Sequence, residues 1–208
     1  MTTQIDTVVF DLGNVLIDWN PRYLFRRSFG GDDQAMERFL AEVFMGPAWN
    51  EKLDAGRPWE EVMALATESH PHHAPQFELY RTRWQEALGE PIPGSLAIFQ
   101  TLKRAGMPLY ALTNWSHLTF PHALDRYPFL HDFDEIVVSG QEGLIKPDPA
   151  LFKILLARTG IEAGRSVFID DNAKNIATAH ALGFHAVHFQ GAEDLERDLR
   201  ALGLPLGR

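Results

Sequence analysis

The sequence predicts an α/β fold with a Rossmann-like parallel sheet and a helical segment inserted after the first strand. Two patterns carry this prediction. After residue 93, short apolar runs alternate with amphipathic helical runs, which is the order typical of a parallel sheet covered by helices on both faces. Between residues 19 and 92 the apolar period is that of helices. The 208 residues are therefore expected to form a core from residues 1–18 and 93–208, with residues 19–92 as the inserted segment.

The first strand is expected over residues 7–10, which are β-branched or aromatic, and Gly13 then lets the backbone turn away. In the inserted segment, the apolar residues of 36–44 follow the i, i+3, i+4, i+7 spacing of one helix face. Residues 59–66 repeat this spacing, and residues 77–88 carry a looser stripe. We expect a small helical subdomain with its own apolar seam.

Four further strands are expected after the inserted segment, each followed by a helix. With the first strand between the second and the fourth, in the order 3-2-1-4-5 or similar, the carboxyl ends of these three strands meet at a topological switch point. Ligands bind at such points in open α/β sheets, so the chemistry is expected there. The expected strands cover residues 108–112, 135–138, 166–169 and 185–189, and the expected helices cover residues 95–104, 120–126, 150–158, 173–182 and 192–203.

The composition is that of a globular chain, and its 45% hydrophobic content supports a sizeable core. The formal net charge of −9, from 28 acidic and 19 basic residues, argues against nucleic acid or a membrane as a partner, although a small anionic substrate stays compatible with it. The chain has no cysteine, so it has no disulfide framework and no thiol nucleophile. The first residues lack a targeting pattern, and no apolar run approaches about 18 residues. We expect a cytoplasmic protein, of an oligomeric state that the sequence leaves open.

Three carboxylates follow the two strands expected to lie side by side at the centre of the sheet. Asp11 follows the first strand, and Asp170 and Asp171 follow strand 166–169. Adjacent carboxylates repel one another unless a cation, a proton or hydrogen-bond donors compensate. Together the three would form a compact, oxygen-rich site, the ligand type that Mg²⁺ prefers. The alternative is that Asp11, Asp171 or Asn172 caps the helix that follows.

Three further polar residues are expected at the same edge of the sheet. Thr113 and Asn114 end the second strand, where a hydroxyl and an amide beside backbone N–H groups suit a phosphate or another oxyanion. Lys146 precedes Pro147, which restricts the local backbone, and can pair with both a carboxylate and a substrate anion. The alternatives are a polar turn or helix cap for the first two residues and a solvated surface lysine for the third.

In this order, the segments FDLGNV, LTNW, KPDP and FIDDNAKNI resemble the motifs of the haloacid dehalogenase superfamily of hydrolases. They are most similar to its branch of bacterial sugar-phosphatases that includes glucose-1-phosphate phosphatase. That family has a nucleophilic Asp after the first strand, a Ser or Thr after the second, a Lys, and an acidic pair after the fourth. The resemblance covers essentially the whole chain and makes residues 19–92 the family's helical cap. The matching positions are Asp11, Thr113, Lys146, Asp170 and Asp171.

The resemblance implies a Mg²⁺-dependent phosphohydrolase that acts on a small phosphorylated metabolite, with a sugar phosphate favoured. Asp11 would attack phosphorus and form an aspartyl-phosphate. Thr113, the backbone of Asn114 and Lys146 would hold the phosphoryl oxygens. Asn172 would orient the metal ligands without binding the metal itself. The implied metal ligands are Asp11, the carbonyl of Gly13, and Asp170 or Asp171.

Gly13 departs from the family's pattern. Most phosphatases of this family carry a second Asp there as general acid and base, a function worth about 10²–10⁴-fold in rate, and glycine has no proton to give. Four explanations are open: a substituting group such as His117 or Asp18, a leaving group that needs little protonation, a slow enzyme, or a different reaction. One alternative function is a metal-independent 2-haloacid dehalogenase, against which the charge of the acidic pair argues. The other is a non-catalytic protein that binds phosphate and Mg²⁺.

The cap is expected to open for the substrate and to close over it, excluding water. The segment FMGPAWNEKLDAG, with Trp49, Glu51 and Asp54, lies where the caps of this family present specificity residues. An aromatic side chain of the cap could stack on a sugar ring.

Overall fold

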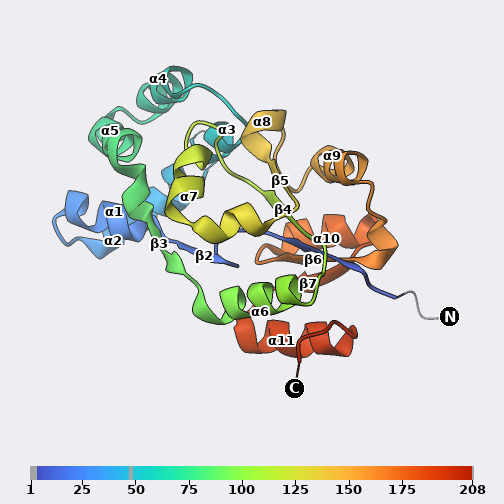
Figure 1. Ribbon diagram of the computed structural model, residues 1–208. Helices are drawn as coiled ribbons and strands as arrows, with labels where there is room; N and C mark the ends of the chain where they lie inside the picture. The colour runs from blue at the N-terminus through green and yellow to red at the C-terminus, as the bar shows by residue number, and fades with distance from the viewer. Residues whose placement is uncertain (1–3, 47–48, 208) are drawn as a thin grey trace.

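The computed structural model describes residues 4–46 and 49–207 of the chain. Within them, five strands form a parallel sheet in the order β5-β4-β1-β6-β7, which is the predicted 3-2-1-4-5 order (Figure 1). Val9 in the central strand β1 lies opposite Tyr110 of β4 on one side and opposite Phe168 of β6 on the other. The strands are β1 (Thr7–Phe10), β4 (Leu109–Thr113), β5 (Glu135–Val138), β6 (Ser166–Asp170) and β7 (His185–His188).

The central strand β1 is buried on both faces of the sheet, as its continuous apolar run predicts. Val8 and Phe10 face the side covered by α6 and α11, where the Phe10 ring packs edge-on against Phe99. Val9 faces the opposite side, covered by α9 and α10. Each such side chain, fully removed from water, contributes roughly 1.5–3 kcal/mol. The helices of the core are α6 (Pro93–Arg104), α7 (Phe120–Arg126), α8 (Ser139–Glu142), α9 (Pro149–Thr159), α10 (Ala173–Ala181) and α11 (Ala192–Ala201).

A helical insertion, residues 20–87, lies between β1 and the other strands of the sheet in the sequence. In space it lies to one side of the sheet (Figure 1). It is joined to the core by a short antiparallel pair, β2 (Ile17–Trp19) and β3 (Leu88–Pro91). This pair was not predicted, because strands this short, with Gly89 and Pro91 in one of them, carry no alternating pattern. The helices of the insertion are α1 (Arg22–Phe25), α2 (Asp33–Phe39), α3 (Asn50–Asp54), α4 (Trp59–Ser69) and α5 (Ala74–Arg83).

The apolar stripes predicted for the insertion form its interior. Phe39, Phe44, Phe77 and Tyr80 are buried there, and Trp49 stacks on Phe77 with ring centroids 4.6 Å apart. The apolar stripe that begins in α2 continues through a π-helical turn. The apolar side chains after the end of the α-helix therefore still point into the interior. The single-turn segments of the chain are η1 (Arg26–Phe29), η2 (Leu40–Phe44), η3 (Pro71–His73), η4 (Trp84–Ala87), η5 (Pro128–Asp132) and η6 (Ala163–Arg165).

The insertion contacts the core where α3 meets α8. The Ser139 hydroxyl donates a hydrogen bond of 2.6 Å to the carbonyl oxygen of Asp54. Gly56, with φ of +81°, brings its backbone so close to Gly140 that an added Cβ would overlap the Gly140 carbonyl. These two contacts place the end of α3 above the carboxyl ends of the central strands.

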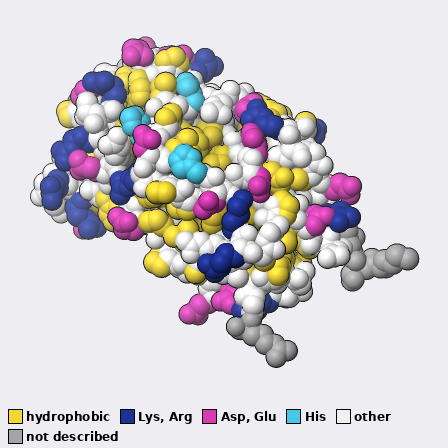
Figure 2. Space-filling model, in the orientation of Figure 1, with side chains coloured by type: hydrophobic (Ala, Val, Ile, Leu, Met, Phe, Trp, Pro, Cys, Tyr) yellow, Lys and Arg dark blue, Asp and Glu magenta, His cyan; other side chains and the backbone are white. Residues whose placement is uncertain are grey.

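The surface shows mixed charge. On the face drawn in Figure 2, acidic and basic side chains are interspersed and the view contains no broad basic patch. Among residues 4–46 and 49–207, no helix has both the length and the apolar character needed to cross a membrane.

Candidate active site

Asp11 lies directly after β1 at the carboxyl edge of the sheet and is 8% exposed. Its Oδ1 accepts hydrogen bonds from the backbone N–H of Leu12 (2.8 Å) and from Lys146 Nζ, 2.9 Å away. Burial raises the pKa of Asp11 to about 7, against the opposing effect of Lys146 and with a further increase from Asp170. Additional positive charge at this site would therefore favour the ionised carboxylate.

Lys146 is buried beneath Asp11 and joins the ends of three strands. Its Nζ donates to Asp170 Oδ2 (2.7 Å) and to the carbonyl oxygen of Leu112 (2.7 Å), in addition to Asp11. Burial lowers the pKa of Lys146, but the two carboxylates outweigh it, so that its pKa is raised and the ammonium stays charged. All three of its N–H donors are directed at protein groups, so any effect on a bound anion would come mainly through charge.

Asn114 holds the Lys146 segment in place. Its side-chain amide donates to the Lys146 carbonyl oxygen (3.0 Å) and accepts from the Lys146 backbone N–H (2.7 Å). The Asn114 side chain is thus committed to the protein, and its role in holding phosphate stays a prediction for its backbone N–H. Thr113, the last residue of β4, is buried and lines the cavity beside it.

Asp170 is the last residue of β6 and is fully buried. It accepts hydrogen bonds from Lys146, from the backbone N–H of Asn172 (2.8 Å) and from the side-chain amide of Asn175 (2.9 and 3.0 Å). The Asn172 side chain caps α10 by accepting from the backbone N–H of Lys174. Asn175 was not predicted as a site residue; its signal is its position three residues after Asn172, on the face of α10 that turns back toward the strand end.

Asp171 is exposed to the cavity, next to the buried Asp170. Burial of its carboxylate and the charge of Asp170 raise the pKa of Asp171. One oxygen each from Asp11, Asp170 and Asp171 lies within 4.8 Å of the others. Three carboxylates face one ammonium here, so a hard divalent cation fits both the donor chemistry and the uncompensated charge. Gly13 lines the same cavity, which is compatible with its predicted role.

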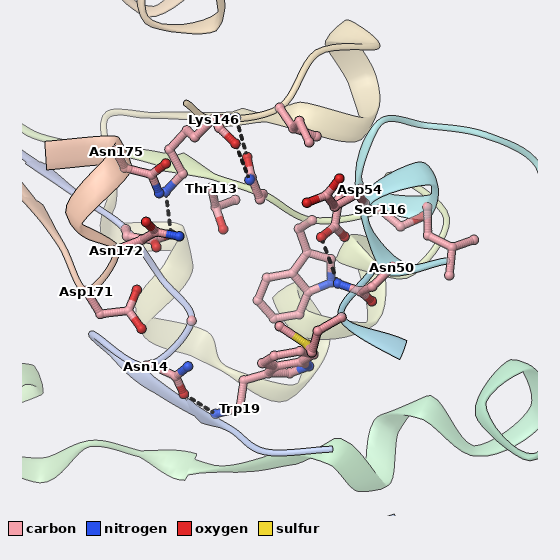
Figure 3. A pocket seen from close by; sticks show the side chains of 18 of the residues that line it. Asn14, Trp19, Asn50, Asp54, Thr113, Ser116, Lys146, Asp171, Asn172 and Asn175 are labelled. Carbon is pink, nitrogen blue, oxygen red and sulfur yellow. Dashed lines mark hydrogen bonds and ion pairs between the residues drawn. The ribbon is translucent and has the colours of Figure 1, made fainter. Parts of the chain in front are cut away.

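A cavity of about 680 Å³ separates this cluster from the helical insertion. Figure 3 shows Asp171, Asn172 and Asn14 on one side of it, with Asp54 and Asn50 on the opposite side. Asn14, the non-glycine residue with positive φ among the described residues, also favours the charged form of Asp171. The aromatic residues that line the cavity are Trp19, Trp59, Tyr80, Trp84 and Trp115.

Only some of the residues predicted from the sequence to set specificity or to act as the acid line the cavity. Glu51 and Asp54 both line the cavity, whereas Trp49 is buried inside the insertion. Pro47 and Ala48 of the same segment lie outside the described residues. Asp18 accepts a hydrogen bond from the Tyr23 hydroxyl (2.6 Å) near the surface, and neither Asp18 nor His117 belongs to the described residues that line the cavity.

The family model for haloacid dehalogenase-like hydrolases matches residues 5–183. The chain belongs to this family. Two relatives align with it along nearly their whole length. A sesquiterpene phosphatase of Aspergillus oryzae is 27% identical, over 97% of this chain and 98% of that protein. A phosphatase of Mycobacterium tuberculosis is 28% identical, over 96% of each. Both of these relatives are named as phosphatases.

Other relatives differ in length or in reaction. The chain spans only 19% of acyl-CoA dehydrogenase family member 10 of Mus musculus, with 28% identity over 96% of the chain. An (S)-2-haloacid dehalogenase of a Pseudomonas species is 24% identical, over 88% of this chain and 83% of that protein.

Solved structures share the fold. A HAD family enzyme of Bacteroides thetaiotaomicron in a magnesium complex is 21% identical, with a TM-score of 0.70 over 94% of this chain and 98% of that one. The same enzyme has been solved with magnesium and inorganic phosphate, with 23% identity and a TM-score of 0.65 over 88% and 93% of the two chains.

Proposed function

We propose that this chain is a Mg²⁺-dependent phosphohydrolase that acts on a small phosphorylated metabolite through an aspartyl-phosphate. One observation carries the proposal. Asp11, Asp170 and Asp171 converge within 4.8 Å at the floor of a cavity, with Lys146 buried beneath them. A carboxylate nucleophile, a site for a divalent cation and a fixed positive charge are the parts that phosphoryl transfer requires.

Asp11 is the proposed nucleophile. Lys146 and the backbone N–H of Leu12 both bind its Oδ1, and no group in the described part of the chain donates to Oδ2. Oδ1 is therefore held in place, and Oδ2 would be the attacking oxygen of this residue, which lines the cavity. Attack on phosphorus would form an acyl phosphate and release the alcohol, and attack of water would then free phosphate and regenerate Asp11.

Asp11, the Gly13 carbonyl, Asp170 and Asp171 are the proposed metal ligands. When bound, Mg²⁺ supplies positive charge that screens the repulsion between the carboxylate nucleophile and the substrate phosphate. Asp170 already makes four hydrogen bonds to Lys146, Asn172 and Asn175, while Asp171 is exposed to the cavity. We expect Asp171 to bind the metal directly and Asp170 to act mainly by holding Lys146 in position.

The phosphoryl oxygens are expected to bind at the end of β4. Thr113 offers a hydroxyl there, and Asn114 offers its backbone N–H, since its side chain holds the Lys146 segment. Lys146 adds positive charge from below. Fixed donors and charge around the transferring group account for most of the catalysis in this class of reaction.

The helical insertion is the proposed cap, and its aromatic side chains are the proposed binding surface for the leaving group. Trp59 and Trp84 of the insertion, together with Trp19 of β2, line the cavity on that side, where an indole ring can stack on a sugar. This supports a sugar phosphate as substrate. The same wall also contains Met45, Leu53 and Leu88, which favours the phosphate ester of an apolar alcohol as the second candidate.

The test is an assay of phosphate release from 4-nitrophenyl phosphate, a panel of sugar phosphates and an isoprenoid phosphate, with Mg²⁺ and with a chelator. We expect metal-dependent release that Asp11→Asn abolishes while the protein stays folded. Asp125→Asn, which makes the same change at an exposed residue of α7, is the matched control and should retain activity. Near-parental rates in Asp11→Asn would contradict the nucleophile, and metal-independent halide release from 2-haloacids would replace the proposal with a dehalogenase.

A further inference from the structure

The proposed reaction lacks an obvious source for the proton that the leaving oxygen needs. Gly13 lies two residues after Asp11 and has no ionisable group. A Cβ built at Gly13 meets no atom within 4 Å, and its backbone is not in the left-handed region. An acidic side chain would therefore fit there, and the cavity has room for one. A proton donor for the leaving oxygen would therefore have to be another residue of the cavity wall.

Asp54 is the acidic residue that the helical insertion places over the strand ends. It is the last residue of α3, it lines the cavity, and it lies across the cavity from Asp171 (Figure 3). Its carbonyl oxygen is anchored to the core by Ser139, and its Oδ2 accepts a hydrogen bond from the Asn50 side chain (3.0 Å). Both its backbone and its carboxylate are thus held, at the junction of insertion and core.

We propose that Asp54 is the general acid and base of this enzyme, supplied from the helical insertion in place of the residue absent at Gly13. The inference rests on the proposed function. In the first step, Asp11 forms a bond to phosphorus as the phosphorus–oxygen bond to the alcohol breaks, and the proton of Asp54 passes to the leaving oxygen. In the second step, water attacks the acyl phosphate, and its proton passes to the Asp54 carboxylate. Phosphate leaves, Asp11 is regenerated, and Asp54 is protonated again.

The surroundings of Asp54 suit a group that both gives and takes a proton. Burial raises the pKa of Asp54 to about 7, with a further increase from Glu51 on the same helix. Lys146 and the backbone N–H of Ser116, on the core side, oppose this increase. Tyr80 of α5 also faces this carboxylate, and burial raises the pKa of its phenol, so it stays neutral. Both protonation states of Asp54 are then present at neutral pH, where general acid and base catalysis is most effective.

The other acidic candidates are less suited. Glu51 lines the cavity as well, but its side chain is exposed, one turn before Asp54. Asp18 is hydrogen-bonded to Tyr23 outside the cavity. Asp170 and Asp171 belong to the proposed metal site and cannot serve both roles.

The experiment compares pre-steady-state and steady-state turnover of Asp54→Asn on two aryl phosphates. With 4-nitrophenyl phosphate, whose leaving group departs without a proton, we expect a rapid burst of one equivalent and then turnover at least 100-fold slower than in the parent. With phenyl phosphate, whose leaving group needs the proton, we expect no burst and a loss of about 10²–10⁴-fold. With phenyl phosphate, for which protonation of the leaving group limits the rate, the parent should lose kcat as pH rises through about 7, and Asp54→Asn should lack this decrease.

Two further variants separate catalysis from structure. Glu60→Gln removes one negative charge from an exposed position of the same insertion, on α4, and should give no burst and an unchanged ratio between the two substrates. Gly13→Asp combined with Asp54→Asn restores an acid where there is room for it, and should recover at least tenfold of the phenyl phosphate activity. This recovery would not follow from a merely structural role of Asp54.

Three outcomes would overturn the inference. They are a rate of Asp54→Asn within threefold of the parent on both substrates, an equal loss on both without a burst, and a high-pH decrease that persists in the variant. Failure of the proposed function is distinguishable, because the parent would then release no phosphate or Asp11→Asn would retain the activity. An active parent with an unaffected Asp54→Asn variant overturns the role of Asp54 alone.

Discussion

At the scale of single residues, Lys146 determines the arrangement of the site. Its ammonium is enclosed by Asp11, Asp170 and the Leu112 carbonyl, so it links the ends of β1, β4 and β6. Buried charges of this kind are stable only as ion pairs, because removing one partner leaves the other desolvated and unpaired. Its positive charge also keeps the proposed nucleophile closer to its ionised form.

Lys146→Ala should therefore lose both stability and activity. We expect the free energy of unfolding to fall by roughly 3–5 kcal/mol, because Asp11 and Asp170 stay buried without their counter-charge. Turnover should fall by at least about 100-fold. Lys153→Ala, an exposed lysine of α9, removes the same charge and should leave both close to the parent values. Thermal unfolding and phosphate release measure the two effects, and turnover of Lys146→Ala within tenfold of the parent would contradict this account.

At the scale of elements, the position of α3 decides what the cavity contains. This helix has five residues and no side-chain N-cap, so its own hydrogen bonds contribute little to holding it in place. It is held instead by α8, through the hydrogen bond from Ser139 to Asp54 and the close backbone approach of Gly56 to Gly140. A change at this contact should act on catalysis without touching the core site.

Gly56→Ala tests that contact. The new Cβ would overlap the Gly140 carbonyl and also occupy a left-handed backbone position, so α3 has to shift away from the core. Gly30→Ala is the matched control, since Gly30 also has a positive φ of 60° but no atom within 4 Å of the added Cβ. We expect Gly30→Ala to cost about 1–2 kcal/mol with kcat/KM unchanged. Gly56→Ala should cost more and should reduce kcat/KM about tenfold, and equal kcat/KM in the two variants would contradict the role given to α3.

At the scale of the whole molecule, the cavity is built by two units that are separate in sequence. The core supplies the carboxylates from strand ends and Lys146 from the loop before α9, and residues 20–87 supply Asp54 and most of the aromatic wall. In the proposed metal site, three carboxylates surround the single ammonium of Lys146. Their mutual repulsion destabilises the fold, and a divalent cation would reduce it.

Mg²⁺ should therefore stabilise the folded chain. At a concentration 100-fold above its dissociation constant, binding to the folded state alone adds about 2.7 kcal/mol, which corresponds to a rise in Tm of about 5–10 °C. Asp171→Asn removes an exposed ligand and should greatly reduce this rise, whereas Asp125→Asn should keep it. The measurement is thermal unfolding with and without Mg²⁺, and an undiminished rise in Asp171→Asn would exclude that residue from the metal site.

Much of the core could be predicted from local pattern. The strands at residues 7–10 and 135–138 have the predicted bounds, and the order of the sheet is the predicted one. The convergence of Asp11 and Asp170 followed from that order, because parallel strands bring their carboxyl ends to one edge. Lys146 reaches them from the loop between α8 and α9, and its match to the family motif is what pointed to it. The π-helical turn after α2 and the pairing of β2 with β3 could not be predicted, since neither has a pattern of its own in the sequence.

Hydrophobic period and strand direction were sufficient to predict the α/β class, the order of the central strands and the residues at their ends, because these depend on short-range pattern. The family followed from the resemblance of four short motifs. Tertiary structure decided which groups complete the site. Asp54 reaches the cavity through a contact with Ser139, 85 residues away in the chain, and Asn175 binds Asp170 only because α10 turns back over its own strand. Such placements depend on the packing of distant elements, which no local pattern records.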